Sequence, residues 1–170
     1  MNFNDYIRNI PDFPKEGILF KDITPLLKDK KAFKSAIDAM AEEYKDMEID
    51  YVVGIEARGF IIGTPMAYAL DKGFIPVRKP GKLPHDKLTA NYDLEYGSNE
   101  LEIHKDAIDE GDKILLVDDL LATGGTTKAS VDLIEELGGD IVGIAFLLEL
   151  MDLNGREKIE GYDIFTLLQH

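Results

Sequence analysis

The residues best suited to chemistry lie in the segment Val117–Thr127, which reads Val-Asp-Asp-Leu-Leu-Ala-Thr-Gly-Gly-Thr-Thr. Two acids, Asp118 and Asp119, follow an apolar run, and a loop of small residues leads to threonines that can begin a helix. Glycines let a backbone approach its ligand, and N–H groups and threonine hydroxyls at a helix start can hold a phosphate. The two carboxylates can accept hydrogen bonds from vicinal sugar hydroxyls. The whole string therefore predicts a sugar-phosphate site, although a lone Gly-Gly-Thr would favour an ordinary capped turn.

The net charge of the chain is −14, from 19 lysines and arginines against 33 aspartates and glutamates. A protein that binds nucleic acid needs a basic surface to neutralise phosphates, so this composition argues against such a partner. One basic stretch stands out, because four cations lie within ten residues that contain a single acid, Asp86: Arg78, Lys79, Lys82 and Lys87. A small anionic ligand can bind there.

Two common nucleotide-binding motifs are missing from the sequence. The Walker A loop needs a glycine followed by lysine and then serine or threonine, and no glycine here has that continuation. The dinucleotide fingerprint G-x-G-x-x-G is also missing, because Gly54, Gly59 and Gly63 have the wrong spacing. The sequence therefore gives little support to an ATPase or a dehydrogenase.

The chain contains no cysteine, which excludes disulfides, a thiolate nucleophile and a metal site built from cysteine. Its histidines, His85, His104 and His170, lack the spacing of metal ligands, and we predict no protein metal ligand. Residues 1–10 lack the apolar core of a secretory signal, and the longest apolar run, Ile141–Leu148, is too short to cross a bilayer. We therefore expect a soluble, cytoplasmic protein that does not contact a membrane.

The segments around these residues predict an α/β fold. Apolar residues recur at helical spacing near 31–46, and further helices are predicted after Gly59 and over about 126–137, before Gly138-Gly139. Short apolar runs rich in β-branched residues predict strands at 51–55, 74–77, 114–117 and 141–148. Because these runs are continuously apolar, we expect a mainly parallel sheet with helices on both faces. Such sheets bind ligands beyond the carboxyl ends of their strands. The two acids follow the predicted strand 114–117, so they lie where a ligand is expected to bind.

Two parts of the chain depart from this alternation. In 88–104, apolar and polar residues alternate on both sides of Gly97-Ser98, which predicts an inserted β-hairpin. The first thirty residues carry several prolines and predict an irregular hood that leads into a helix capped by Thr24. We expect one domain over 1–170, with the hood at 1–30 and a lid and hairpin at 78–104.

The segment Val117–Thr126 resembles the motif that binds 5-phosphoribosyl-1-pyrophosphate (PRPP) in type I phosphoribosyltransferases. Four further segments are similar to the adenine-specific branch of that family and occur in its order: Phe13–Pro25, Glu56–Phe60, Arg78–Pro84 and Tyr92–Gly97. The likeness covers essentially the whole chain. It implies the type I phosphoribosyltransferase fold, a twisted and mainly parallel sheet flanked by helices. It also implies the reaction of adenine with PRPP to give AMP and pyrophosphate.

The resemblance assigns roles around PRPP. Asp118 and Asp119 would bind the ribose hydroxyls, and the 5′-phosphate would lie in the loop formed by Ala122, Thr123, Gly124, Gly125 and Thr126. Pyrophosphate would bind a second loop, formed by Glu56, Ala57, Arg58 and Gly59. The resemblance also implies a cis peptide bond between Glu56 and Ala57. The guanidinium of Arg58 offers phosphate a rigid fork of donors, so we predict that it is catalytic rather than part of a surface ion pair.

A mobile lid, 78–91, would close over the pyrophosphate with the basic residues Arg78, Lys79 and Lys82; the plainer interpretation is a solvated loop. For the base, the resemblance implies that the backbone of Leu19 reads adenine while Phe20 stacks on it. Glu95 would reach the purine near N7 and share a proton with it, which makes it the second predicted catalytic residue. A single strand carboxylate would otherwise be ordinary surface.

The family further implies Mg²⁺ held chiefly by PRPP and water, and a homodimer. Lys21, Pro80 and His85-Asp86 depart from the family pattern, which concerns affinity more than activity. Two alternatives stay open. One is a phosphoribosyltransferase for hypoxanthine, guanine, xanthine or orotate; the other is a regulator that keeps the fold and senses PRPP or nucleotides. The lid and pyrophosphate loop are intact, which favours turnover.

Overall fold

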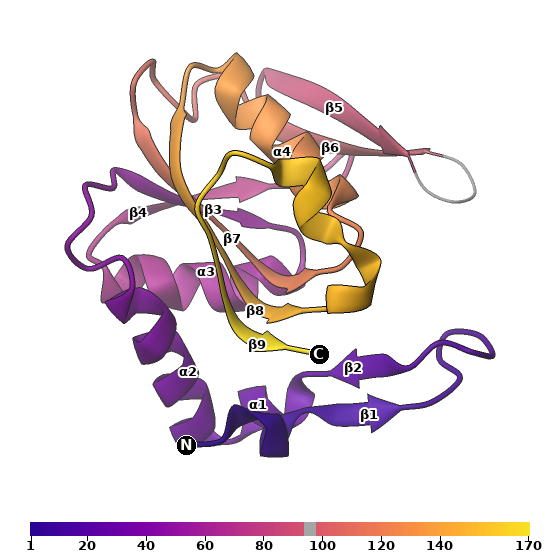
Figure 1. Ribbon diagram of the computed structural model, residues 1–170. Helices are drawn as coiled ribbons and strands as arrows, with labels where there is room; N and C mark the ends of the chain where they lie inside the picture. Colours follow the sequence, from indigo (N-terminus) through magenta and orange to yellow (C-terminus); the bar gives the residue numbers. More distant parts are fainter. Residues whose placement is uncertain (94–97) are drawn as a thin grey trace.

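A five-stranded parallel sheet forms the centre of the computed structural model, which describes residues 1–93 and 98–170 (Figure 1). Its strand order is β4-β3-β7-β8-β9, with the bounds Gly73–Val77, Tyr51–Ile55, Lys113–Leu121, Asp140–Glu149 and Ile164–Gln169. All neighbouring strands of this sheet run parallel, as predicted. The last strand, β9, was not predicted, because its apolar run follows a polar segment without helical spacing.

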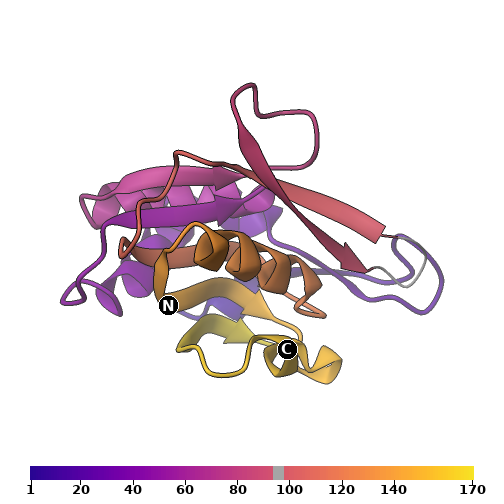
Figure 2. The ribbon, with the colours of Figure 1, turned by 90° about the horizontal axis from the view of Figure 1, so that it is seen from above.

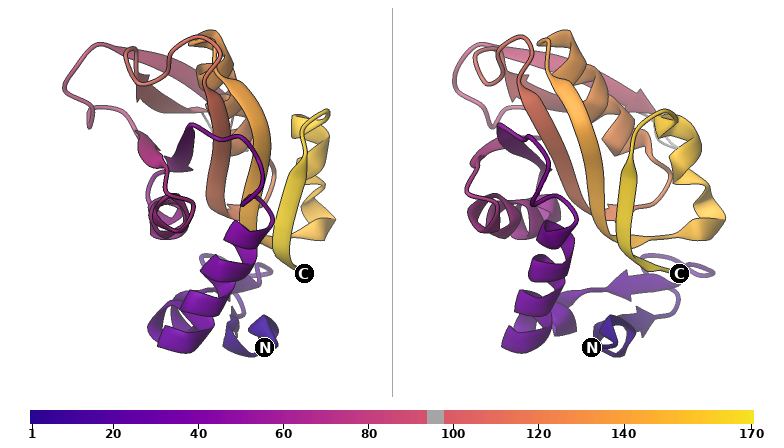
Figure 3. Two further views of the ribbon diagram at one scale, coloured as in Figure 1. Left: turned by 90° about the vertical axis from the view of Figure 1, so that its left-hand side faces the viewer. Right: turned by 60° about the vertical axis from the view of Figure 1, so that its left-hand side comes forward.

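Helices cover both faces of the sheet, so its strands are apolar on both sides. On one face, α1 (Thr24–Lys28), α2 (Lys30–Glu42) and α3 (Arg58–Ala69) pack on one set of alternating strand residues: Val52, Leu115, Val117, Ala145 and Leu147. On the other face, α4 (Gly125–Glu136) packs on the set between them: Val53, Leu116, Ile144 and Phe146. Figure 3 shows these two layers from the side. The helix predicted over 31–46 ends earlier, at Glu42, and the chain then turns.

The predicted hairpin is present and covers one face beside α4. It consists of β5 (Lys87–Asp93) and β6 (Ser98–His104), which are antiparallel, and it extends beyond the sheet in Figure 2. Leu101 and Ile103 are buried against the core cluster of α4, so the hairpin is anchored by its second strand. The predicted catalytic residue Glu95 and its neighbours 94–97 lie outside the described residues.

The hood contains regular structure, which corrects the prediction of an irregular segment. After the 3₁₀ turn η1 (Phe3–Tyr6), β1 (Arg8–Ile10) pairs antiparallel with β2 (Phe20–Asp22). Thr24 is the first residue of α1 rather than its cap. The Asp22 carboxylate accepts hydrogen bonds from the Thr24 N–H and hydroxyl, each 2.9 Å long, because an acid two residues earlier reaches both donors. Figure 1 shows β2 below the end of β9, close to the last residue.

The strand that carries the two acids is longer than predicted. β7 continues to Leu121 because the long β8 still pairs with it, Asp118 with Phe146 and Leu120 with Leu148. Pairing with β3 stops at Val117, so from Asp118 onward one edge of β7 is free of that strand. The acids therefore lie within a strand, on an edge that opens toward the loop after β3. Among the described residues, no helix combines the length and apolar character required to cross a membrane.

Candidate active site

A cavity of about 410 Å³ lies at the carboxyl ends of β3 and β7. Most of its walls come from predicted residues: Glu56, Ala57, Arg58, Lys79, Asp118, Asp119, Ala122, Thr123, Gly124 and Thr126. Three further lining residues were not predicted: Tyr92, Leu120 and Thr127. Thr127 directly follows the predicted loop, and Tyr92 belongs to a segment of alternating apolar and polar residues. The sequence could therefore have indicated both residues as part of the site. Leu120 carried no chemical signal.

The loop from β7 to α4 forms the cavity wall that the sequence predicted for a phosphate. Gly124 has φ = 83°, and a Cβ there would lie 2.4 Å from the Gly155 carbonyl oxygen, so no other residue fits without displacing the backbone. Helix α4 starts at the next residue and has no side-chain cap. Its first N–H groups therefore have no capping partner from a side chain, which suits an anion in the cavity.

The two acids differ in their partners. Asp119 is 5 % exposed and pairs with the Arg58 guanidinium, with 2.9 Å between Oδ2 and Nε. Asp118 Oδ1 accepts the Asp119 backbone N–H at 2.8 Å. A Cβ on Gly59 would lie 2.6 Å from that Oδ1, so the glycine leaves room for the carboxylate. Burial raises the pKa of Asp118, and the neighbouring Asp119 carboxyl raises it further. Burial also raises the pKa of Asp119, although Arg58 opposes the shift.

Glu56 connects the loop after β3 with the predicted lid. Its carboxylate accepts the Lys79 backbone N–H at 3.0 Å and pairs with Arg78 at 3.1 Å and Lys82 at 3.0 Å. Burial favours a higher pKa for Glu56, but these hydrogen bonds outweigh it and lower the pKa. The bond between Glu56 and Ala57 is cis, which confirms that prediction. Arg78 and Lys82 thus reach the cavity through Glu56 rather than lining it.

The hood residues lie beside this cavity. The Arg58 guanidinium lies 5.8 Å from the centre of the Phe20 ring. Leu19, which is 49 % exposed, lines a second cavity of about 410 Å³ between the hood and the segment after β8. Besides Leu19, its walls comprise Gly17, Ile18, Lys21, Leu150, Asp152, Leu153 and His170. Of the two residues predicted to bind the base, Leu19 therefore lines the second cavity, whereas Phe20 lies against Arg58, which lines the first.

Residues from both ends of the chain meet at the second cavity. Lys21 Nζ lies 3.0 Å from His170 Nδ1 and donates to Asn9 at 2.8 Å, and His170 Nε2 lies 2.8 Å from Asn4 Oδ1. Burial, and then the Lys21 charge, lower the pKa of His170. A neutral ring can accept from Lys21 at Nδ1 and donate to Asn4 at Nε2. The Lys21 contact favours the neutral form, whereas a charged ring could also donate to Asn4. Sequence reasoning gave His170 no role.

Comparisons with known proteins match nearly the whole chain. A phosphoribosyl transferase domain is recognised over residues 24–169. The adenine phosphoribosyltransferase of Halothermothrix orenii is 69 % identical over 169 residues, which cover 99 % of each chain. The chain belongs to the adenine phosphoribosyltransferase family. A crystal structure of the adenine phosphoribosyltransferase from Thermoanaerobacter pseudethanolicus superposes with a TM-score of 0.96 at 55 % identity, covering 99 % of this chain and 98 % of that one.

A more distant adenine phosphoribosyltransferase retains the same fold with ligands bound. The Saccharomyces cerevisiae protein, complexed with adenine and an imino-altritol bisphosphate, is 42 % identical. It superposes with a TM-score of 0.92 and covers 97 % of this chain and 96 % of its own. The type I phosphoribosyltransferase fold predicted from the sequence is thereby confirmed.

Several residues predicted from the adenine phosphoribosyltransferase pattern do not line the first cavity: Gly59, Gly125, Arg78, Lys82, Leu19 and Phe20. Each nevertheless contacts a wall of it or of the second cavity. Gly59 lies against Asp118, and Gly125 lies beside Tyr92, whose ring would be 3.7 Å from an added Cβ. Sequence spacing located the two loops, but only the folded chain assigns each residue to a wall or its support.

Proposed function

We propose that this chain transfers the phosphoribosyl group of PRPP to adenine, with release of pyrophosphate and formation of AMP. The observation that carries the proposal is one cavity in which two loops meet. The acid pair and the glycine-rich loop after β7 face the Glu56–Arg58 loop after β3. PRPP has a matching arrangement, with ribose hydroxyls in the middle, a 5′-phosphate at one end and a pyrophosphate at the other. The relatives' names, and the adenine in the yeast complex, support adenine as the base.

The PRPP side uses groups already aligned in the cavity. The 5′-phosphate binds Ala122–Thr126, where backbone N–H groups at the start of α4 and threonine hydroxyls supply donors. Asp118 and Asp119 accept hydrogen bonds from the ribose hydroxyls. Arg58 uses its Nε for Asp119, so its remaining guanidinium donors can bind pyrophosphate while it stays paired.

The lid cations complete the pyrophosphate site. Arg78 and Lys82 are attached to Glu56, and Lys79 lines the cavity. When the pyrophosphate group arrives, these cations can share their donors between the Glu56 carboxylate and the phosphate oxygens. Closure of the lid then excludes water and strengthens each of these charge interactions.

The reaction needs no nucleophilic side chain. The bond from the anomeric carbon to pyrophosphate breaks with the electron pair leaving on oxygen, and adenine N9 bonds to the ribosyl carbon and loses its proton. The protein stabilises the departing charge with Arg58 and the lid cations. Glu95 is proposed to share the purine proton near N7, on the strength of the family resemblance.

Mg²⁺ is proposed to enter with PRPP. Two of the acids that line the first cavity already pair with cations: Asp119 pairs with Arg58, and Glu56 with Arg78 and Lys82. Among the described residues, no three histidine, aspartate or glutamate side chains come together as a metal-binding group. This donor set fits a metal held through substrate oxygens and water. Asp118 also lines this cavity, and the described residues supply no ion pair to it. When bound, Mg²⁺ supplies positive charge that offsets the charge of PRPP.

The base is proposed to bind in the second cavity. By the family resemblance, the Leu19 backbone would offer its carbonyl oxygen to adenine N6 and its N–H to N1, and Phe20 would stack on the ring. The proposal also includes a homodimer and a cytoplasmic location, both from the family resemblance and, for location, from the lack of cysteine.

A direct assay tests the function. The protein is incubated with PRPP, Mg²⁺ and adenine, hypoxanthine, guanine, xanthine or orotate in turn, and the nucleotide formed is identified by chromatography. AMP from adenine, and far less product from the other bases, is the expected result. A different nucleotide would reassign the base, and no nucleotide with any base would point to a regulator that only binds.

A further inference from the structure

The segment after β8 contacts both cavities of the site. Leu150, Asp152 and Leu153 line the second cavity, beside the hood. Two residues further on, Gly155 packs on the phosphate loop: a Cβ on Gly155 would lie 2.3 Å from the Ala122 carbonyl oxygen. The Leu150 N–H also donates to the Leu121 carbonyl oxygen at 2.9 Å. The segment Leu150–Gly155 therefore joins the wall of one cavity to the back of the other.

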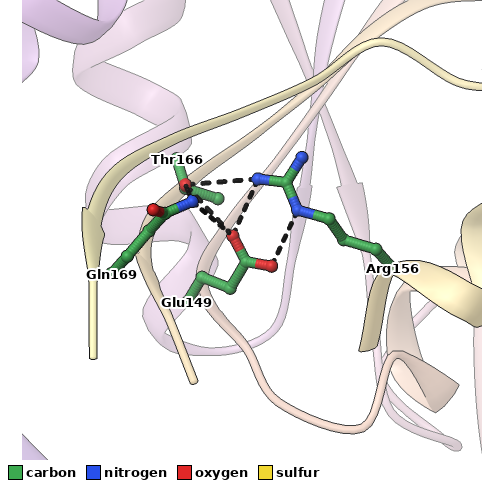
Figure 4. A network of polar contacts seen from close by, with 4 residues as sticks. All are labelled: Glu149, Arg156, Thr166 and Gln169. Atoms are coloured by element: carbon green, nitrogen blue, oxygen red, sulfur yellow. Dashed lines mark hydrogen bonds and ion pairs between the residues drawn. The ribbon is translucent and has the colours of Figure 1, made fainter. Parts of the chain in front are cut away.

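An ion pair between a buried carboxylate and a half-exposed arginine holds the end of this segment. Glu149, the last residue of β8, is 3 % exposed and binds Arg156 in the 3₁₀ turn η3 (Gly155–Ile159). Both carboxylate oxygens are used, with 2.7 Å from Oε1 to Arg156 Nε and 2.7 Å from Oε2 to Nη2. Thr166 and Gln169 of β9 donate to the same carboxylate at 3.1 and 3.3 Å (Figure 4). Three elements thus converge on one carboxylate.

The chemistry of this pair makes it a rigid link. Two parallel hydrogen bonds fix both the distance and the orientation of the guanidinium, which a single charge contact does not do. The Arg156 hydrogen bonds lower the pKa of Glu149 although burial opposes them, so the carboxylate stays charged. The turn η2 (Met151–Leu153) lies between the two ends of the pair, so its place is set by the ring that Glu149 and Arg156 close.

We propose that Glu149 and Arg156 are positioning residues, whose ion pair presses Gly155 against the loop between β7 and α4. This contact fixes the second cavity, proposed for the base, relative to the first cavity, proposed for phosphoribose. This inference rests on the proposed function, because only a reaction between a base and a phosphoribosyl group needs that relation. AMP spans both cavities, whereas adenine and ribose 5-phosphate each occupy one. The pair should therefore matter more for AMP than for either fragment.

The test compares Arg156→Lys and Glu149→Gln with a control at the opposite end of the same strand. The control is Asp140→Asn, which removes the surface pair of Asp140 with Lys113 at the amino ends of β8 and β7. Arg156→Lys keeps the charge but loses the fork. Thr166→Val is a milder variant that removes one hydrogen bond to Glu149. It allows the same measurements if the other two variants do not fold. Calorimetry gives the affinities of the whole chain for AMP, adenine and ribose 5-phosphate, and kinetics give kcat and KM.

The expected result is selective. In Arg156→Lys, the affinity for AMP falls about 10-fold, while the affinities for adenine and for ribose 5-phosphate each change less than about 2-fold. The reason is that AMP can bind both cavities at once only if they are correctly placed relative to each other. The kcat of the same variant falls about 10- to 100-fold through misplacement of the reacting groups. Asp140→Asn leaves these values unchanged. Equal losses for AMP and for both fragments, or unchanged values in all three variants at Glu149, Arg156 and Thr166, would overturn the inference while AMP formation by the wild type stands. A wild type that neither makes nor binds AMP would overturn the proposed function as well.

Discussion

The two halves of the proposed site, one for phosphoribose and one for the base, are built on different supports. The phosphoribose half follows β3 and β7, two central strands of the sheet, and its acids are buried beside a paired arginine. The base half lies between the hood and the end of the chain, where polar contacts such as Lys21 with His170 join the two. A central sheet gives little freedom to the loops it carries, while a hood held by side chains can adjust. We therefore expect the half proposed for the chemistry to be more rigid than the half proposed for base recognition.

The largest effect should follow from removing the arginine of the phosphoribose half. Arg58→Ala should lower kcat about 100- to 1,000-fold, as when a preorganised donor to developing charge is removed. It should also leave Asp119 buried without a cation, so PRPP binding weakens. Steady-state kinetics measure both. The matched control is Arg8→Ala, which removes the exposed arginine that pairs with the buried Asp22 in the hood. If Arg58→Ala keeps wild-type kcat, the pyrophosphate charge is stabilised elsewhere.

Discrimination between bases tests the base half. Hypoxanthine carries an acceptor where adenine has its N6 donor, and a donor where adenine has N1. Each mismatch leaves a buried group unpaired at ~1–3 kcal/mol, so adenine should be preferred roughly 100-fold or more in kcat/KM. Because the reader is backbone, Leu19→Ala should weaken adenine binding modestly and keep the preference. Comparable kcat/KM values for the two bases would contradict the assignment of adenine and spare that of the transferase.

The acid pair gives the next effect, and its two consequences have opposite signs. Asp118→Asn and Asp119→Asn should each lower kcat/KM about 10- to 100-fold, since an amide is a weaker acceptor than a carboxylate. Stability should move the other way for Asp118. Its pKa is raised in the folded protein, so its contribution to stability is present at low pH and is lost as pH rises through that raised value.

The Tm of Asp118→Asn should therefore gain on the wild type as the pH rises from about 4, the usual range of an aspartate, to neutral. Thermal unfolding of both proteins over this range measures the difference. The side-chain amide oxygen that Asp118→Asn introduces can still accept the Asp119 N–H, so the fold keeps that hydrogen bond. If the Tm of the variant minus that of the wild type falls as the pH rises from about 4 to neutral, the result would contradict the raised pKa.

The same difference between the halves explains what the sequence could predict. The phosphate loop and the acid pair are contiguous from Asp118 to Thr126, so one string carried fold, position and chemistry together. The helices and central strands followed from apolar periodicity. The length of β7 did not, because its last residues are held by a partner strand, β8, that is distant in sequence.

The base half depends on residues that are far apart along the chain. Lys21 and His170 are separated by 149 positions, and Thr166 and Gln169 bind Glu149 from 17 and 20 positions away. No local pattern marks such contacts, since each residue alone is an ordinary polar residue. Leu19 and Phe20 were predicted only through the family resemblance, and the role of Glu95 stays a prediction of that kind.

The smallest expected effect concerns His170, which joins the hood to the core. Its pKa is lowered by burial and by Lys21, so the neutral ring that accepts from Lys21 predominates near pH 7. A lowered histidine pKa means that this link is fully present above the usual value of about 6.5 and is lost as pH falls through the lowered one. Asp152 is the acid among the described lining residues of the same cavity, and its charge would favour the charged ring. The Glu149 carboxylate already binds Arg156.

Protonated His170 would face the Lys21 ammonium, and the hood would lose its contact with the end of β9. The KM for adenine in the wild type should therefore rise a few-fold, about 2- to 5-fold, as pH falls from 7.5 to 5.5, the energy of about one hydrogen bond. The KM for PRPP, measured in the same series, should not follow it, because the phosphoribose half rests on the sheet. In His170→Asn the KM for adenine should be nearly independent of pH, since an amide does not titrate in this range. A parallel rise of both KM values, or a pH dependence that survives in His170→Asn, would mean that the hood is held as firmly as the phosphate loop, and that the two halves do not differ in the way their contacts indicate.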